Sequence, residues 1–579
     1  MNPSLEFRFP YTSRAEEKPA QPGAAHTGVP PFTRLRRILA TERNQLWIAL
    51  IYSLAIGLLT LVVPIATQSL VNTIAFGNLL QPLVILTLVV VAGLGVSTIF
   101  QSMRVYLVEI IQRRVFVRVA SESVGRLLRV RGDAFDSHHG PELVNRFFDV
   151  VTVQKSAAML LIEGLSVAMQ TVIGMLLLAV YHPWLLAFDL LLVAAILFVL
   201  FPLGAGAVPT AIRESKAKYE LVAWLEEIAR HTVTFKSEAG ARFAFDRTDQ
   251  LVASYLGYRG KHFRIVLRQI LGSLGLQALA SASLLGVGGW LVMQRQLTLG
   301  QLVASELVVA LVVSGFSKFG KHLEVFYDLL AAIDKLGHIQ DLPSESSGKE
   351  TLPPASQGAG VVFRQVVFGY AGAQPVLNGA NFVAEPGTRT GIVAHSGSGK
   401  STALNLIYGL LQPQGGAIEI DGFDLRHLSK ADLRSQVLLL RHSEIFHGSI
   451  LDNVRLGAQE KNHAEVREAL EQAGILEDIL RLPGGLDCEL ATGGLPLSAG
   501  QTVQLMFARA FLMRPRLLIV DELMDQLHDA RERDTILNRL FAPNPTWTLL
   551  IASADATILE GCDRVWEIHD GLLTAGVKQ

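Results

Sequence analysis

The segment 388–410, TRTGIVAHSGSGKSTALNLIYGL, contains the clearest sign of the fold. A short apolar run ends in a glycine-rich turn, which is followed by Lys400, Ser401 and Thr402 and then by residues typical of a helix. In such a strand–turn–helix unit, backbone N–H groups and the helix N-terminus surround phosphate oxygens, and the lysine adds a positive charge. The segment therefore predicts a phosphate-binding loop in an α/β domain.

The loop departs at one position from the pattern G-x-x-x-x-G-K-[ST], because its first residue is Ala394. Two glycines are kept, so we expect the backbone amides still to surround an anion, and the serine hydroxyl is placed to bind Mg²⁺. An ordinary glycine-rich turn is the alternative, which the order of strand, turn, Lys-Ser-Thr and helix disfavours. The residues expected to bind ATP here are Ser396, Gly397, Ser398, Gly399, Lys400, Ser401 and Thr402.

A second motif, RPRLLIVDEL, follows about 120 residues after the loop. Four apolar residues, 517–520, predict a buried strand that ends in Asp521 and Glu522. At a strand end beside a phosphate loop, Asp521 can hold Mg²⁺ and Glu522 can act as the general base that polarises the attacking water. An acidic residue at an ordinary strand end is the alternative, and the spacing to the loop argues against it.

The N-terminal half is more strongly apolar than a soluble enzyme of this size would be. Half of the 579 residues are hydrophobic, the mean hydropathy is +0.36, and only 18% are charged, where about a quarter is usual. The apolar excess lies almost entirely before residue 335. A membrane span needs about 20 mostly apolar residues. The segments that meet this length lie near 46–70, 81–102, 157–181, 183–205, 266–293 and 301–330.

Two of the connections between these segments are long and basic, namely 104–155 and 213–268. Positively charged connections stay cytoplasmic, so both termini and the C-terminal domain fall on the same side of the bilayer. Both connections also show the apolar periodicity of helices, which would extend beyond the membrane. We therefore expect a multi-pass integral membrane protein with six helices.

Three carboxylates, Glu163, Asp189 and Glu306, fall inside the expected spans. Ionised groups in hydrocarbon are costly, so each needs a partner or a wet cavity. They either line a substrate path or hold helices together.

Composition also predicts the N-terminal tail and the boundaries between the domains. Residues 1–34 are polar and rich in Pro, Gly and Ala, without a signal peptide, and we expect a disordered cytoplasmic tail. The transmembrane domain spans 35–339, a Pro/Ser/Gly-rich linker spans 340–358, and the nucleotide domain spans 359–579. A net charge of −1 disfavours nucleic acid as a partner, and two cysteines make no disulfide framework.

The stretch LSAGQTVQLMFARAFL resembles the signature of ABC ATPases. The LSGGQ-type motif is matched by Leu497, Ser498, Ala499, Gly500 and Gln501. The same residues form the capping box Ser-x-x-Gln, so a well-capped helix is a compatible interpretation. In the ABC family this helix end meets the γ-phosphate of ATP bound to the opposite subunit. The resemblance therefore implies a dimer in which two half-sites come together.

The resemblance covers nearly the whole chain after residue 35. The stretch FDSHHGPELVNRFFDVV is similar to the turn of ABC exporters that docks on an ATPase domain. Tyr370, in Phe-Gly-Tyr, resembles the aromatic residue that stacks on adenine, although a core tyrosine is the alternative. The positions that match the docking turn are Phe135, Gly140, Glu142, Leu143, Arg146 and Asp149.

Several positions depart from the family pattern. Arg441 or His442 stands where a glutamine is expected, His528 replaces the aspartate of the SALD loop, and Ser553 replaces the histidine that contacts the γ-phosphate. Losing one transition-state contact costs about 10²–10³ in rate. We expect ATP to bind normally and the homodimer to hydrolyse it slowly.

Taken together, the resemblance implies an all-α membrane domain joined to an α/β P-loop domain, which exports a substrate from a bacterial inner membrane by ATP hydrolysis. The substrate could be a peptide, lipid, drug or secreted protein. One alternative is an ATP-binding, weakly hydrolysing regulatory subunit of a heterodimer, which the altered positions favour and Glu522 opposes. Another is an importer built on the same fold.

Overall fold

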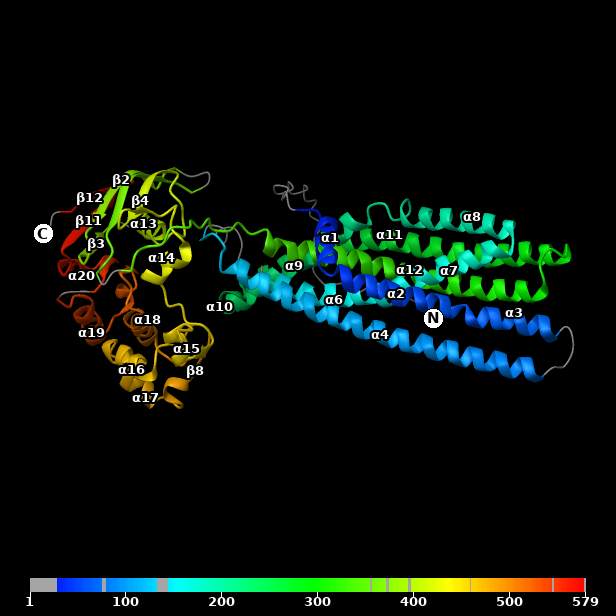
Figure 1. The fold of residues 1–579 in the computed structure, drawn as a ribbon. Helices are drawn as coiled ribbons and strands as arrows, with labels where there is room; N and C mark the ends of the chain where they lie inside the picture. Colours follow the sequence, from blue (N-terminus) through cyan, green and yellow to red (C-terminus); the bar gives the residue numbers. More distant parts are fainter. Residues whose placement is uncertain are drawn as a thin grey trace. The chain divides into compact units, whose positions relative to one another are not determined.

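The computed structural model describes residues 29–74, 80–132, 144–354, 357–370, 374–393, 397–458, 460–543 and 546–576. The chain forms two compact units (Figure 1). The helical unit comprises Met1–Arg129 and His138–Leu342, and the α/β unit comprises Val130–Ser137 and Pro343–Gln579.

The helical unit is built from long helices that pack side by side. Its N-terminal elements are α1 (Pro31–Thr41), α2 (Arg43–Thr60), α3 (Val62–Ile74), α4 (Leu80–Leu127), η2 (Arg146–Phe148), α6 (Asp149–Met159) and a π-helical turn, η3 (Leu160–Gly164). The remaining elements are α7 (Leu165–Tyr181), α8 (Pro183–Leu200), α9 (Ala207–Arg230), α10 (Thr232–Phe235), α11 (Glu238–Met293) and α12 (Leu299–Gln340).

Five helices of the described chain are long and apolar enough to cross a membrane: Arg43–Thr73, Gln81–Leu127, Arg146–Tyr181, Pro183–Leu200 and Glu238–Met293. The sixth predicted span begins with the shorter apolar stretch Leu299–Val312 of α12. Over the described residues, which leave out 133–143, the prediction that the long basic connections are helical is confirmed, because α4 and α11 have 48 and 56 residues and run far beyond one bilayer thickness.

Apolar side chains lie on both the inside and the outside of the helical unit. Leu178, Leu284 and Leu291 are fully buried between helices, whereas Leu88 and Leu191 are largely exposed. A soluble protein would bury such a surface, but lipid tails solvate it without cost. The distribution is the one expected of a bundle in a bilayer.

The α/β unit contains a six-stranded sheet of order β12-β11-β3-β10-β9-β6, in which all pairs except β12–β11 are parallel. An antiparallel sheet has the order β2-β1-β4-β5, and β7 pairs with β8. The strands are β1 (Val361–Phe368), β2 (Leu377–Ala384), β3 (Arg389–Val393), β4 (Gly415–Ile420), β5 (Phe423–Asp424), β6 (Val437–Leu440), β7 (Gly448–Ser449), β8 (Glu489–Leu490), β9 (Leu517–Asp521), β10 (Thr548–Ala552), β11 (Arg564–His569) and β12 (Leu572–Ala575).

The helices and short turns of this unit follow the strands along the chain (Figure 1). They are α13 (Lys400–Ile407), α14 (Lys430–Gln436), α15 (Ile450–Arg455), α16 (His463–Gln472), α17 (Leu476–Arg481), η4 (Gly485–Asp487), α18 (Ala499–Met513), η5 (Met524–Gln526), α19 (Ala530–Leu540) and α20 (Ala556–Glu560).

The central strands of the six-stranded sheet are buried on both faces. Along β9, Leu517 and Ile519 belong to one hydrophobic core, while Leu518 and Val520 belong to the other. Successive side chains of a strand point to opposite faces, so a strand covered on both sides reads as a continuous apolar run. This is why the run before Asp521 is recognisable in the sequence.

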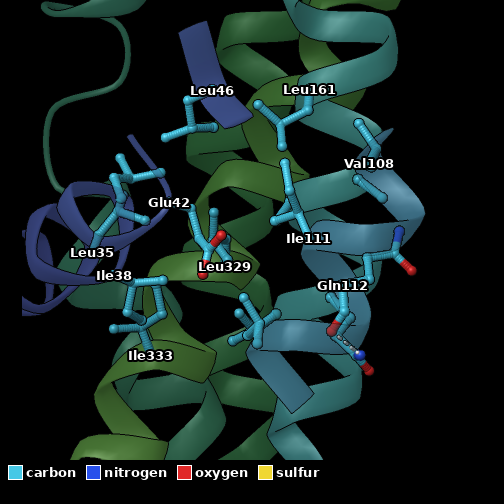
Figure 2. Close-up of a pocket in the computed structure, with 16 residues that line it drawn as sticks. Leu35, Ile38, Glu42, Leu46, Val108, Ile111, Gln112, Leu161, Leu329 and Ile333 are labelled. Atoms are coloured by element: carbon cyan, nitrogen blue, oxygen red, sulfur yellow. Dashed lines mark hydrogen bonds between the residues drawn. The ribbon is translucent and has the colours of Figure 1, made fainter. Parts of the chain in front are cut away.

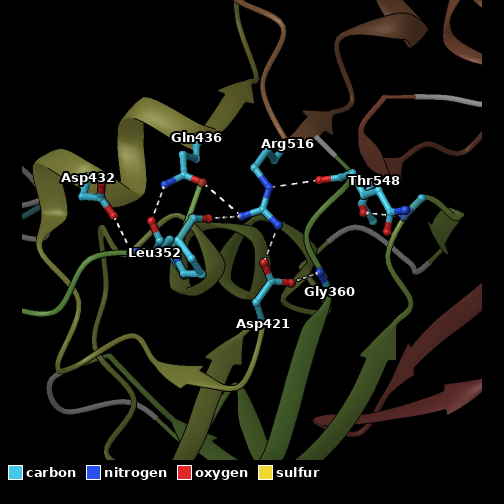
Figure 3. A network of polar contacts seen from close by, with 10 residues as sticks. Leu352, Gly360, Asp421, Asp432, Gln436, Arg516 and Thr548 are labelled. Atoms are coloured by element: carbon cyan, nitrogen blue, oxygen red, sulfur yellow. Dashed lines mark hydrogen bonds and ion pairs between the residues drawn. The ribbon is translucent and has the colours of Figure 1, made fainter. Parts of the chain in front are cut away.

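A polar network fixes the chain that enters β9 (Figure 3). The Arg516 guanidinium donates to the carbonyls of Pro353 and Gln357 and to the Gln436 side chain, and it forms an ion pair with Asp421. One arginine thereby joins the segment that precedes β1 to the end of β4 and to the start of β6. The network holds the strands whose carboxyl ends form the site described below.

Candidate nucleotide-binding site

The predicted phosphate loop connects β3 to the N-terminus of α13, and its geometry depends on glycine. Gly399 immediately precedes α13 with φ = +105°, and a Cβ at this position would lie 2.6 Å from Val376 Cγ1. Gly397 also has a positive φ, +82°, and a Cβ there would meet open space. The backbone can therefore approach a ligand closely at this loop. Ala394 and Ser396 lie outside the described residues.

Lys400 and Glu522 face each other at the end of the loop. The Lys400 side chain is 8% exposed, and its Nζ lies 3.2 Å from Oε1 of Glu522, whose side chain is 52% exposed. Glu522 has φ = +54°, and its N–H donates to the carbonyl of Ala552. A positive φ in a residue other than glycine is strained, and such strain is concentrated at functional sites.

Asp521 is the buried carboxylate of the site. It is the last residue of β9, opposite Ala552 of β10. Burial raises the pKa of Asp521, the hydrogen bond from Ser401 opposes this, Glu522 raises the pKa further, and the positive charges of Lys400 and Arg441 lower it. The carboxylate is therefore tied directly to the first turn of α13.

Two buried oxygen atoms at the loop make no hydrogen bond to any described residue: Oδ1 of Asp521 and Oγ of Ser398. Buried polar atoms are almost always satisfied, so unsatisfied ones indicate a missing partner. A carboxylate and a hydroxyl oxygen are the hard donors that Mg²⁺ prefers. Asp521 and Ser401 therefore fit a magnesium site, and Ser398 fits a contact with phosphate.

Tyr370 lies beside the first turn of α13. Its hydroxyl is 3.2 Å from Oγ1 of Thr402, and its ring packs edge-on against Phe368 with a centroid distance of 5.2 Å. The residue is 38% exposed, so it is not a core tyrosine. Its role in stacking on adenine stays a prediction.

The predicted capping box is present at the start of α18. The Ser498 hydroxyl accepts from the N–H of Gln501 at 3.2 Å, and the Gln501 side chain accepts from the N–H of Ser498 at 3.0 Å. The Gln501 amide also donates to Asp478. Leu497 is buried, and a Cβ at Gly500 would lie 2.5 Å from Glu532. The signature thus forms a rigid helix start whose first amides point away from the helix.

The pairing register of β6 and β9 indicates which of the two altered residues, Arg441 or His442, lies at the site. Leu440, the last residue of β6, pairs with Val520, so the next residue, Arg441, lies beside Asp521 at the carboxyl edge of the sheet. His442 is exposed. The sequence left both residues as candidates, and the structure selects Arg441.

Ser553, a second altered position, forms a hydrogen bond with Asp525, a residue that no sequence motif singled out. The Ser553 hydroxyl donates to Oδ1 of Asp525 at 2.5 Å, and the N–H of Ala554 donates to Oδ2 at 3.2 Å. His528 lines a cavity with Asp525 and Arg533. Asp525 follows the buried strand by only four residues, and this spacing was the available signal.

Of the predicted docking turn, residues 133–143 lie outside the described residues, so the positions at Phe135, Gly140, Glu142 and Leu143 are untested. The Arg146 guanidinium contacts Nδ1 of His338 at 2.6 Å, and Asp149 accepts a hydrogen bond from the Tyr219 hydroxyl at 2.7 Å. Both residues are therefore held within the helical unit.

The three carboxylates of the expected spans differ in their surroundings. Glu163 lies 3.5 Å from His322. Asp189 is buried, and within the described chain neither of its carboxylate oxygens has a hydrogen-bond partner. The buried Oε2 of Glu306 is likewise unpartnered there. The pairing of Glu163 with His322 favours a role in holding helices together. For Asp189 and Glu306, both interpretations stand: lining a substrate path and holding helices together.

A separate cavity in the helical unit is almost entirely apolar (Figure 2). Leu35, Ile111, Leu161 and Leu329 line it, and Glu42 is held there by an ion pair with Arg118. Its lining offers too few polar groups for a nucleotide, so the α/β unit holds the candidate ATP site.

Comparisons with known proteins agree with this geometry. Residues 46–315 match the family of ABC transporter transmembrane regions, and residues 377–525 match the ABC transporter family. The chain is 28% identical to an ATP-dependent lipid A-core flippase of Xanthomonas campestris over 89% of this chain and 87% of that protein. It is 29% identical to a mycobactin import ATP-binding/permease protein of Mycolicibacterium thermoresistibile over 65% and 68%, respectively.

Two further known proteins are similar to this chain. A cyclolysin secretion/processing ATP-binding protein of Bordetella pertussis is 26% identical over 84% of this chain and 68% of its own length. A solved structure of a bacterial Atm1-family ABC exporter with ATP bound has the same fold, with a TM-score of 0.79, 23% identity, and coverage of 93% of this chain and 96% of that chain.

Proposed function

Because the chain belongs to the ABC transporter family, as a fused half-transporter of the exporter type, we propose that it pairs with a second half-transporter and exports a substrate across a bacterial inner membrane. ATP would bind at the loop between β3 and α13 on the cytoplasmic side. Closure of the two nucleotide domains would then change the arrangement of the membrane helices.

One observation carries the ATPase proposal: four chemically matched side chains converge where β3 meets α13 and β9 ends. Lys400 would bind phosphate oxygens by charge. Ser401 and Asp521 would hold Mg²⁺, which when bound neutralises phosphate charge. Glu522, half exposed beside Lys400, would accept a proton from the attacking water.

The dimer proposal rests on the first turn of α18. Its capped N-terminus presents free amides and the positive end of a helix dipole, which suits an anionic phosphate. We infer that Ser498, Ala499 and Gly500 contact ATP bound to the other copy. The partner is a second copy of this chain or a related half-transporter.

We further propose that the chain hydrolyses ATP slowly. Ser553 is committed to Asp525, and serine carries no positive charge for the γ-phosphate. The loss of one such contact corresponds to about 10²–10³ in rate. Lys400, Ser401 and Asp521 are unaffected by this change, so we expect ATP affinity to be ordinary.

The test is ATP hydrolysis by the purified chain in liposomes, with Glu522→Gln as control and ATP binding measured separately. We expect normal binding by both proteins, slow turnover in the unchanged chain, and none in Glu522→Gln. Rapid turnover would contradict the slow-hydrolysis proposal, and absent ATP binding would overturn the whole assignment.

A regulatory subunit that binds but does not hydrolyse ATP is the second candidate, favoured by the Ser553–Asp525 contact. It predicts equal, background turnover in the chain and in Glu522→Gln. An importer is a third, since one relative is described as a mycobactin importer. Transport measured in both directions across oriented vesicles separates import from export.

A further inference from the structure

Arg441 introduces a second cation at the carboxyl edge of the six-stranded sheet. It directly follows β6, and the parallel pairing of Leu440 with Val520 aligns it with Asp521. In open α/β sheets, ligands bind at this edge. The position of Arg441 is therefore fixed by strand register.

The Arg441 side chain extends toward the phosphate-binding helix. Its Nη1 lies 3.5 Å from Oδ1 of Asn405 in α13, and its Nε lies 3.6 Å from Oε1 of Glu444. Both contacts are at the long limit for a hydrogen bond or ion pair, and the side chain is one-third exposed. These contacts place the guanidinium against the second turn of α13, where its neighbours hold it only loosely. A long side chain that starts beside Asp521 and is held this weakly is free to turn toward the phosphate loop.

The charges at the site are balanced differently from those of a site with a single lysine. Asp521 and Glu522 contribute two carboxylates, and Lys400 pairs with Glu522. Arg441 lies beside the other carboxylate, because strand register places it next to Asp521. A guanidinium is charged at every accessible pH and matches phosphate oxygens in a two-pronged geometry.

We propose that Arg441 binds the terminal phosphates of ATP and supplies part of the positive charge that Mg²⁺ would otherwise provide, so that nucleotide binding depends little on the metal. The inference rests on the proposed ATP site. It assigns to Arg441 a binding role that is separate from hydrolysis.

A phosphate-binding arginine affects metal-free ATP and MgATP differently, whereas a purely structural arginine would affect both alike. Without metal, Arg441 attracts the bare triphosphate. With metal, Arg441 and Mg²⁺ repel each other, and part of that attraction is lost. Removing the arginine should therefore weaken metal-free ATP while leaving MgATP unchanged or tightening it. A guanidinium in contact with a phosphate, with about 4 Å between the charges at an effective dielectric constant of about 20, corresponds to a change of roughly tenfold or more in affinity after screening.

The experiment is a titration of the full-length chain in detergent with trinitrophenyl-ATP, followed by fluorescence, in excess Mg²⁺ and in EDTA. The quantity compared is the ratio of Kd in EDTA to Kd in Mg²⁺. Arg441→Gln removes the charge, and Arg441→Lys keeps it without the two-pronged geometry. Arg426→Gln is the matched control, because Arg426 forms an exposed ion pair with Asp424.

We expect a ratio of at most about threefold for the unchanged chain and for Arg426→Gln. Arg441→Gln should raise this ratio by about tenfold, and Arg441→Lys should give an intermediate value. An unchanged ratio in Arg441→Gln, including equal weakening with and without metal, would overturn the proposal. Failure of the unchanged chain to bind nucleotide in either condition would instead refute the proposed function.

Discussion

Replacing Arg516 by alanine should destabilise the α/β unit selectively. The guanidinium is 12% exposed and holds two backbone carbonyls, the Gln436 side chain and the Asp421 carboxylate (Figure 3). Its loss leaves Asp421 without its cation and the entry to β9 without its clamp. Hydrogen bonds to charged groups contribute about 1.5–3 kcal/mol each, and breaking a buried pair costs about 3–5 kcal/mol. With partial exposure, we expect a loss of about 3 kcal/mol.

Thermal unfolding can report on this unit alone, because both cysteines of the chain lie in it. Cys562 is fully buried, so a thiol-reactive dye labels it only when the unit unfolds. Cys488 is partly exposed and is replaced by serine in the background protein. For a domain of this size, 1 kcal/mol shifts Tm by about 2–4 °C, so Arg516→Ala should lower it by about 6–12 °C.

Arg426→Ala is the matched control for this measurement. Arg426 pairs with Asp424, and its side chain is half exposed. Exposed ion pairs contribute about 0–1 kcal/mol, which corresponds to a shift below about 4 °C. If Arg516→Ala melted as the control does, the network would not stabilise the β9 edge, and our account of how the site is positioned would be wrong.

Three further predictions concern local geometry and charge. Gly399→Ala should lower the affinity for trinitrophenyl-ATP at least about tenfold, because it adds positive-φ strain of about 1–3 kcal/mol and a clash with Val376. The control is Gly457→Ala, where φ is also positive, +82°, but a Cβ meets open space, and this variant should bind the nucleotide normally. Burial lowers the pKa of Lys335 to about 8, below its unfolded value, so the unfolded chain binds more protons above pH 8. The stability of the helical unit should therefore rise by about 2 kcal/mol between pH 8 and 9.5, and Lys335→Met should abolish this rise in tryptophan-detected melting curves. Ser498→Ala should cost about 1 kcal/mol of cap stability, which the thiol-labelling Tm detects, while Ser498→Asp should retain it; equal Tm values for the two variants would contradict the capping role.

The sequence predicted those features that depend on neighbouring residues. The capping box at Ser498 and Gln501 joins positions three apart, and the buried run before Asp521 follows from a strand covered on both faces. The helical character of the long basic connections followed from apolar periodicity in the same way. Local patterns of this kind do not depend on how distant segments pack.

Features that depend on register or on distant segments could not be predicted. The choice between Arg441 and His442 needed the pairing of β6 with β9. The contact of Ser553 with Asp525 joins the end of β10 to the turn η5, and the 2.6 Å approach to Val376 that makes Gly399 necessary comes from the segment before β2. In each case the fold sets the contact, and the local sequence shows at most how far a residue such as Asp525 lies from a predicted strand.

Nucleotide trapping in mixed dimers tests the composite ATP site most directly. Two tagged copies are co-expressed, purified as one assembly and reacted with photoactivated azido-ATP in the Glu522→Gln background. In one assembly, Lys400→Ala and Ser498→Arg are in the same copy, which damages both sites. In the other, each copy carries one change, which leaves one site intact. A site shared between Lys400 of one copy and Ser498 of the other should trap nucleotide only in the second assembly, and equal trapping in both assemblies would contradict such a site.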